Sequence, residues 1–127
     1  MDKVQHFEIP ASDMVRAKKF YSDVFGWSMV EYPMPEMKYT SIYTAEVDEK
    51  HMPKEVGVIN GGMPERTPVV QHPTIAVTVK NIDQTIEKIK KSGGSVAQEK
   101  MKVGDMGWYA YIKDTEGNVI GVWQTLK

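Results

Sequence analysis

The chain has 127 residues and a formal net charge of −1, which is the length of about one domain with a single core. Charged residues make up 26% of the chain without forming a basic face, so nucleic acid is not an expected partner. The chain has no cysteine, which excludes disulfides, thiolate zinc sites and a cysteine nucleophile, and fits a cytoplasmic location. No apolar run approaches the roughly 20 residues of a membrane span, so we expect neither export nor membrane insertion.

The first half of the chain predicts the order strand, helix, strand, strand, strand. Residues 4–9 alternate with the period of a strand, which places His6 and Glu8 on the same face. A helix should follow, with Asp13 near its N-cap and Gly26 at its C-terminal end. The three later strands are expected at residues 27–32, 39–47 and 56–59.

The second half repeats this order. A strand is predicted at residues 74–79, and Asn81 is a helix N-cap with Gln84 three positions later. An offset of 68 residues aligns the two predicted helices. The final strands are expected at residues 95–101, 108–113 and 118–124. We therefore expect a single domain over residues 1–127, with a first module at 4–60 and a second at 72–125.

The predicted fold class is α+β, with two βαβββ modules that form curved mixed sheets around a cavity and carry their helices outside. Alternation along the strands assigns side chains to a helix side and a cavity side. The helix side should hold Phe7, Ile9, Ile75, Val77, Ile120 and Val122. The cavity side should hold His6, Glu8, Thr74, Ala76, Gly121 and Trp123.

Three segments resemble one known superfamily. They are His6-Phe7-Glu8-Ile9-Pro10, the helical run at 17–27 that ends in Phe-Gly-Trp, and the hairpin and strand at 114–124 that end in Gly-Val-Trp-Gln. Together with Gly61-Gly62 between the modules, they are similar to the glyoxalase/bleomycin-resistance/dioxygenase (vicinal oxygen chelate) superfamily. The resemblance covers nearly the whole chain in the right order. It implies the paired βαβββ fold around a small-molecule pocket.

The resemblance also implies positions for a divalent metal. Members with metal chemistry use one ligand from the first strand and one from the last strand of each module. His6 matches the first position, but the equivalent in the second module is Thr74, a poor ligand compared with imidazole. The final-strand position falls on Gly121, which has no side chain. The remaining position stays open between Glu55 and Asn60.

Without a metal, His6 is a candidate general base whose tautomer Glu8 would hold, and this pair is the predicted catalytic pair. The alternative interpretation is a histidine satisfied by a hydrogen bond in the cavity. His72 could replace Thr74 as a ligand only after a shift in strand register. Aromatic side chains on the strands suit stacking against a planar ligand. The predicted pocket residues are Tyr39, Tyr43, Thr74, Trp108, Gly121 and Trp123.

Three functions remain open at this point. The first is a binding protein that encloses a small organic molecule and needs no cofactor, as the missing metal ligands indicate. The second is an enzyme of the superfamily's lyase, isomerase or dioxygenase type, with His6 as metal ligand or base and a divalent metal as cofactor. The third, a pure interaction module, is disfavoured because the architecture leaves a cavity to fill. Exposed sheet edges predict a homodimer.

Overall fold

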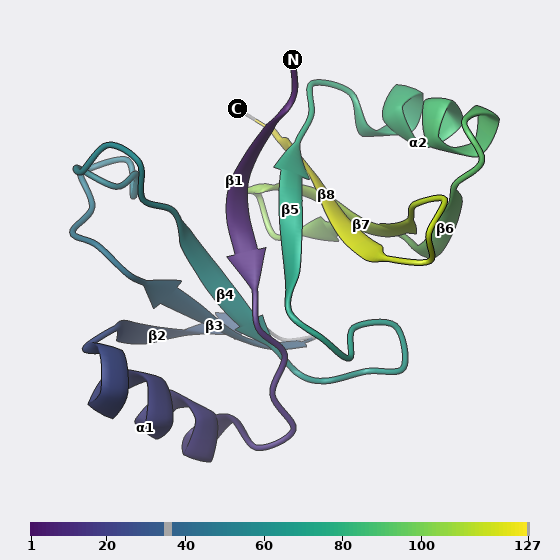
Figure 1. The fold of residues 1–127 in the computed structure, drawn as a ribbon. Helices are drawn as coiled ribbons and strands as arrows, with labels where there is room; N and C mark the ends of the chain where they lie inside the picture. The colour runs from purple at the N-terminus through teal and green to yellow at the C-terminus, as the bar shows by residue number, and fades with distance from the viewer. Residues whose placement is uncertain (35–36, 127) are drawn as a thin grey trace. The chain divides into compact units, whose positions relative to one another are not determined.

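The computed structural model describes residues 1–34 and 37–126. It divides into two compact units, one formed mainly by residues 6–67 and the other mainly by residues 74–126. Each unit contains one helix and a mixed four-stranded sheet (Figure 1).

The first unit has the element order that the sequence predicts. Its strands are β1 (Lys3–Glu8), β2 (Ser28–Met34), β3 (Met37–Tyr43) and β4 (Asn60–Pro64), and its helix is α1 (Met14–Phe25). The strands lie in the order β2-β3-β4-β1. The pairing of β1 with β4 is parallel and the other pairings are antiparallel, which is the arrangement of a βαβββ module.

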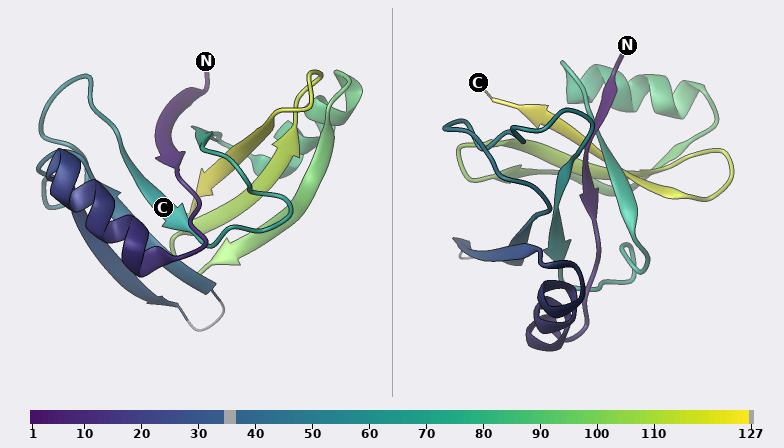
Figure 2. Two further views of the ribbon diagram at one scale, coloured as in Figure 1. Left: turned by 60° about the horizontal axis from the view of Figure 1, so that its bottom comes forward. Right: turned by 60° about the vertical axis from the view of Figure 1, so that its left-hand side comes forward.

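Helix α1 begins and ends where the sequence predicts. The Asp13 side chain accepts a hydrogen bond of 3.0 Å from the backbone N–H of Arg16. Gly26 adopts a left-handed conformation, with φ of 71°, and its N–H donates to the carbonyl of Ser22. The helix lies against the sheet (Figure 2) and packs Ala17 and neighbouring apolar residues into the first core. That core consists of Ala11, Ile42 and Met63, with Phe7, Ile9, Met14, Ala17, Tyr21, Trp27 and Met29 packed around them.

The last strand of the first unit corrects the sequence prediction. Residues 56–59 lie outside the sheet, and Val56 is 98% exposed. The strand is β4, which contains Gly61 and Gly62, although this pair was predicted to belong to the connection between modules. Strand β3 also ends earlier than predicted, at Tyr43. Glycines occupy β4 for a steric reason, because an aromatic ring covers Gly61 on one face of the sheet and another covers Gly62 on the other face.

The second unit repeats the module. Its elements are β5 (Thr74–Thr78), α2 (Ile82–Lys91), β6 (Ser95–Val103), β7 (Gly107–Lys113) and β8 (Val119–Thr125). Their order in the sheet is β5-β8-β7-β6, with β5 and β8 parallel. The Asn81 side chain caps α2 by accepting from the N–H of Gln84 at 3.0 Å, as predicted. The two units therefore confirm the α+β class with two βαβββ modules.

The core of the second unit lies between α2 and the sheet. Its buried members are Val79, Ile82, Ile86, Ala110, Ile112 and Val122. Val77 and Ile120 pack against this cluster, as the predicted alternation requires. Ile75 does not follow the prediction, since 42% of its surface is exposed. It lies near the beginning of β5, before the part of the strand that pairs with β8.

Candidate functional site

The face of the first sheet opposite α1 carries several polar side chains and the tyrosines of β3. These residues alternate with core residues along each strand, because successive side chains of a strand point to opposite faces. We call this surface the first tyrosine face, and its members are His6, Glu8, Tyr39, Ser41, Tyr43, Asn60 and Gly62. It brings together the two predicted catalytic residues and two of the predicted pocket residues.

His6 and Tyr39 form the polar centre of this face. The Nε2 atom of His6 and the Tyr39 hydroxyl share a hydrogen bond of 2.8 Å. Burial lowers the pKa of His6 to about 4, so its imidazole is neutral at pH 7. A neutral imidazole with so low a pKa is a hydrogen-bonding group and a weak base. Glu8, two residues along the same strand, is buried with 1% of its surface exposed.

Gly62 lies directly under the ring of Tyr39. In the sheet Gly62 is the β4 partner of Glu8, while Ser41 pairs with it from β3. A Cβ atom built on Gly62 would overlap the hydroxyl oxygen and the ring carbon that bears it in Tyr39. The tyrosine ring therefore occupies the space that a side chain at position 62 would need. On the other face, Phe7 fills the space above Gly61 in the same way.

The second unit contains the same arrangement on its own sheet. Gly121 is the β8 partner of Ala76, and Tyr111 pairs with it from β7. A Cβ atom on Gly121 would overlap the hydroxyl oxygen of Tyr109, which stands two residues before Tyr111, just as Tyr39 stands two before Ser41. Each module thus pairs a glycine of its last strand with a tyrosine of the neighbouring strand.

The glycine–tyrosine pairs of the two modules bear on whether this chain can hold the metal that the family resemblance implies. The 68-residue offset relates Ala76 to Glu8, and the strand register then relates Gly121 to Gly62. The ligand position that the sequence left open is therefore Gly62. Gly62 and Gly121 have no side-chain donor atom, and a tyrosine ring fills the space that a ligating side chain would need at each position. The donor set does not fit a metal, which usually needs three converging protein ligands.

The other candidate ligands do not complete such a set. Glu55 is exposed and lies before β4 begins. Thr74 is buried, but its hydroxyl donates to the carbonyl of Val119 at 2.5 Å. His72 is exposed and precedes β5. Within residues 1–34 and 37–126, no group of three or more histidine, aspartate or glutamate side chains gathers as a metal site would require.

Asn60 has a different part in the site. It is the β4 partner of His6, and its Oδ1 accepts from the backbone N–H of Thr44 at 2.8 Å. The Nδ2 atom is buried and has no hydrogen-bond partner among the described residues. A buried amide donor without a partner is costly unless a bound group satisfies it. Asn60, beside His6 in the strand register, therefore carries a buried N–H donor for which the described residues supply no acceptor.

The remaining predicted pocket residues lie on both sides of the sheets. Tyr43 belongs to the first tyrosine face, where burial and a hydrogen bond with Tyr32 raise its pKa to about 12. Trp123 lies on the Tyr109 side of the second sheet, with ring centroids 6.0 Å apart. Trp108 does not join them, because it packs against the helix-side core and stacks under the Lys100 ammonium, 4.6 Å from its ring centroid. Its placement corrects the predicted cavity position.

Sequence reasoning missed the part played by Gly62. It counted Tyr109 among the strand aromatics near the cavity but did not include it in the predicted pocket residues. The signal for both was the repeat itself. In the first half, Tyr39 stands two residues before Ser41, the β3 partner of Gly62. In the second half, Tyr109 stands two residues before Tyr111, the β7 partner of Gly121. The second half could have been aligned from the sequence, whereas the first half needed the register of β3 and β4.

Comparison with known proteins agrees with this architecture. The family model described as the Glyoxalase/Bleomycin resistance protein/Dioxygenase superfamily matches residues 3–122, and the chain belongs to this superfamily. It is 28% identical over 117 residues to the lactoylglutathione lyase of Haemophilus influenzae, covering 91% of this chain and 87% of that protein. None of the described helices is long and apolar enough to cross a membrane.

Two further similarities bear on length and fold. CFP32 of Mycobacterium bovis, which carries the name of a glyoxylase, is 28% identical over 92% of this chain, and the chain spans only 43% of its length. The crystal structure of methylmalonyl-CoA epimerase from Mycobacterium tuberculosis superimposes with a TM-score of 0.65 at 16% identity, over 98% of this chain and 88% of that one. At this identity the match establishes the fold.

Proposed function

We propose that this chain binds a small, planar organic molecule on the first tyrosine face and needs no metal for it. One observation carries the proposal: Tyr39 closes the ligand position at Gly62, and Tyr109 closes the equivalent position at Gly121. The fold's usual metal positions are therefore replaced by aromatic surface and phenol hydroxyls. Such surfaces favour planar or apolar ligands, which can stack on the rings.

The polar groups of this face define the rest of the expected ligand. Asn60 Nδ2 is a buried donor without a partner among the described residues, so the ligand should present an oxygen acceptor beside His6. The His6–Tyr39 hydrogen bond fixes the orientation of both side chains. Because the pKa of His6 is lowered to about 4, we assign the imidazole a hydrogen-bonding role at neutral pH. A planar carbonyl compound meets these requirements.

The second candidate function is a metal-dependent lyase, isomerase or dioxygenase that uses His6. The similarity to the lactoylglutathione lyase of Haemophilus influenzae favours it. Glu8, buried two residues from His6, is the acidic residue nearest to that histidine in the strand. This candidate function requires a metal that binds although Gly62 and Gly121 supply no ligand at the two last-strand positions. Lactoylglutathione lyase activity in the presence of nickel or zinc is its direct assay.

The proposed function is tested with saturation-transfer NMR on a panel of neutral carbonyl probes such as acetophenone, benzamide and 1,4-naphthoquinone. We expect at least one probe to bind chelator-stripped protein and to lose affinity about tenfold in Asn60→Leu, because a hydrogen bond to a buried donor is removed. Trp108→Phe is the control, since Trp108 lies on the helix side. If no probe binds, or if Asn60→Leu and Trp108→Phe bind as the wild type does, the assignment of this face is wrong.

Two further properties remain proposals. We propose a homodimer, supported by the strand order, in which β2 and β6 are the end strands and each has one unpaired edge. Sedimentation velocity over a tenfold concentration range distinguishes a dimer from a monomer. We also propose a cytoplasmic location, supported by the absence of cysteine from the sequence.

A further inference from the structure

A concave site apart from the first tyrosine face lies in the first unit, where β1 leads into α1. This pocket has a volume of about 350 Å³. Its lining comes from the loop after β1, from the exposed side of α1, and from Arg66, which stands two residues after the end of β4. The lining residues are Ile9, Pro10, Ala11, Ser12, Asp13, Arg16, Ala17, Phe20, Tyr21 and Arg66. None of them belongs to the first tyrosine face, so this pocket is separate from the site proposed above.

Arg66 is held in place at one end of the pocket. Its Nε donates to the Ser12 hydroxyl at 3.0 Å, and one terminal nitrogen donates to the carbonyl of Pro10 at 3.4 Å. The other terminal nitrogen donates to the carbonyl of Gln71. A guanidinium has five N–H donors, so two remain after these three bonds. Because the side chain is already ordered, those two donors can bind an oxyanion with little further loss of entropy.

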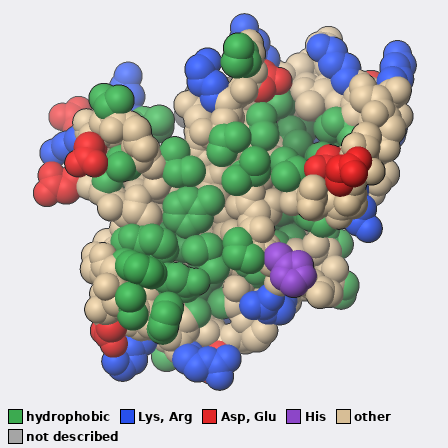
Figure 3. Space-filling view, viewed as in Figure 1, with side chains coloured by type: hydrophobic (Ala, Val, Ile, Leu, Met, Phe, Trp, Pro, Cys, Tyr) green, Lys and Arg blue, Asp and Glu red, His purple; other side chains and the backbone are tan. Residues whose placement is uncertain are grey.

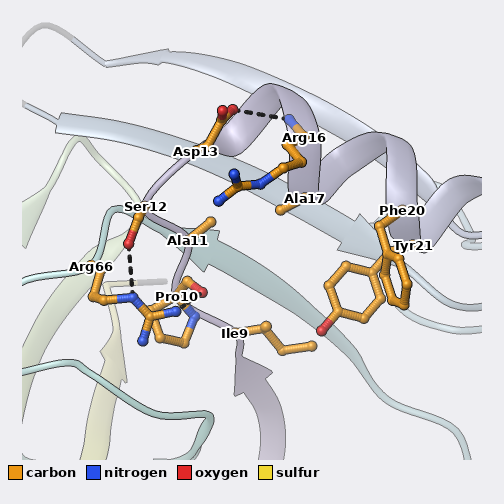
Figure 4. A pocket seen from close by; sticks show the side chains of 10 residues that line it. All are labelled: Ile9, Pro10, Ala11, Ser12, Asp13, Arg16, Ala17, Phe20, Tyr21 and Arg66. Atoms are coloured by element: carbon orange, nitrogen blue, oxygen red, sulfur yellow. Dashed lines mark hydrogen bonds between the residues drawn. The ribbon is translucent and has the colours of Figure 1, made fainter.

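Arg16 brings a second positive charge to the same end. Figure 4 shows both guanidinium groups around Pro10 and Ala11. Across the described part of the chain, neither Arg16 nor Arg66 forms a salt bridge, and no hydrogen bond involves the Arg16 guanidinium. The acidic residue of the lining is Asp13, whose carboxylate accepts the backbone N–H of Arg16. The pocket therefore carries a net positive charge.

The other end of the pocket is aromatic. Phe20 and Tyr21 stand there edge to face, with centroids 5.2 Å apart, and Phe20 is 55% exposed. Tyr21 stacks in turn on Trp27, at 5.2 Å and an interplanar angle of 6°. Apolar side chains gather over this part of the surface (Figure 3), whereas α2 buries both Ile82 and Ile86. Exposed aromatic surface beside two arginines that form no salt bridge within the described residues is typical of a ligand site.

We propose that this pocket binds a small organic carboxylate with a planar apolar body. The carboxylate accepts hydrogen bonds from Arg66 and Arg16, and the body packs on Phe20 and Tyr21. Arginine suits this role because its planar fork matches the two oxygens of a carboxylate. The inference goes beyond the proposed function, since it assigns a second ligand class to a second site.

The test uses 2-naphthoate as the probe, with isothermal titration calorimetry and NMR detection of the arginine Nε–H groups. We expect the wild-type protein to bind the probe with shifts at both arginines, and Arg16→Gln and Phe20→Ala each to weaken binding at least fivefold. Both positions are exposed, so these variants should fold. Lys19→Gln is the matched control: it removes the same charge from an exposed position of the same helix, outside the pocket lining.

Each part of the proposal has an outcome that overturns it. An equal loss in Lys19→Gln and Arg16→Gln would mean that net charge alone attracts the probe. If the neutral 2-naphthalenemethanol binds as tightly as 2-naphthoate, the pocket does not recognise the carboxylate. If inorganic phosphate binds as tightly, the pocket does not recognise the aromatic body. Probe binding should survive in Asn60→Leu, which separates this site from the first tyrosine face.

Discussion

Gly62 offers the most direct structural test of the tyrosine arrangement. A methyl group at this position in Gly62→Ala would overlap the Tyr39 ring, which must move and release its 2.8 Å hydrogen bond with His6. Overpacking costs about 1–3 kcal/mol, and the lost hydrogen bond about 1 kcal/mol. The reduced flexibility of the unfolded chain returns about 0.5 kcal/mol. We therefore expect the free energy of unfolding to fall by about 1.5–3.5 kcal/mol.

A double-mutant cycle in urea denaturation isolates this contact. In the Tyr39→Ala background the ring is absent, so Gly62→Ala should cost at most a few tenths of a kcal/mol, and the coupling energy should equal most of the single-mutant loss. In the Tyr43→Ala background the cost should be unchanged, because Tyr43 lies on the same face but does not cover Gly62. If Gly62→Ala costs the same with and without Tyr39, the ring does not fill that space and the reasoning fails.

Three further predictions concern stability. Because the pKa of His6 is lowered to about 4 in the folded protein, His6 is protonated in the unfolded state first as the pH falls. Up to about 3 kcal/mol of stability should therefore be present above pH 6.5 and lost between pH 6.5 and 4. Urea titrations at several pH values should show this dependence of stability on pH, and the same dependence in His6→Gln would show that His6 does not cause it. Trp108→Ala should lower the free energy of unfolding by about 2–3 kcal/mol through the α2 core while leaving probe binding to the first tyrosine face unchanged, and altered probe affinity would contradict its placement. Asn81→Ala should cost about 1 kcal/mol by removing the α2 N-cap, whereas Lys80→Ala, beside it, should be neutral in the same assay.

The fold was predictable because local signals and alternation agreed. The caps Asp13 and Asn81 and the C-terminal Gly26 stand where the sequence places them. Alternation also separated Phe7 from His6 correctly, since one joins the helix-side core and the other does not. These features depend on short-range geometry, which a sequence carries directly.

The last strand of the first module could not be read in the same way. Val56-Gly57-Val58-Ile59 has the β-branched residues of a strand, and Gly61-Gly62 has the composition of a turn. The structure reverses both assignments, because Phe7 and Tyr39 reach across the sheet and leave room only for glycine. Such contacts join residues that are distant in sequence.

The site was predictable in part. His6, Glu8, Tyr39 and Tyr43 share one face, as alternation within their strands requires. Trp108 was assigned to the pocket together with the aromatic residues around it, although it alternates with Tyr109 and so cannot share its face. Strict use of the period of two would have placed Trp108 with Ile112, where the structure has it.

The measurement that tests the central claim most directly is a titration of the chelator-stripped protein with nickel, zinc, cobalt, manganese and iron(II), followed by calorimetry and native mass spectrometry. Tyr39 over Gly62 and Tyr109 over Gly121 close two ligand positions, so we predict no stoichiometric binding that depends on His6. Tight binding of one equivalent that disappears in His6→Ala would contradict the account, and metal-dependent lyase and dioxygenase assays would then take precedence.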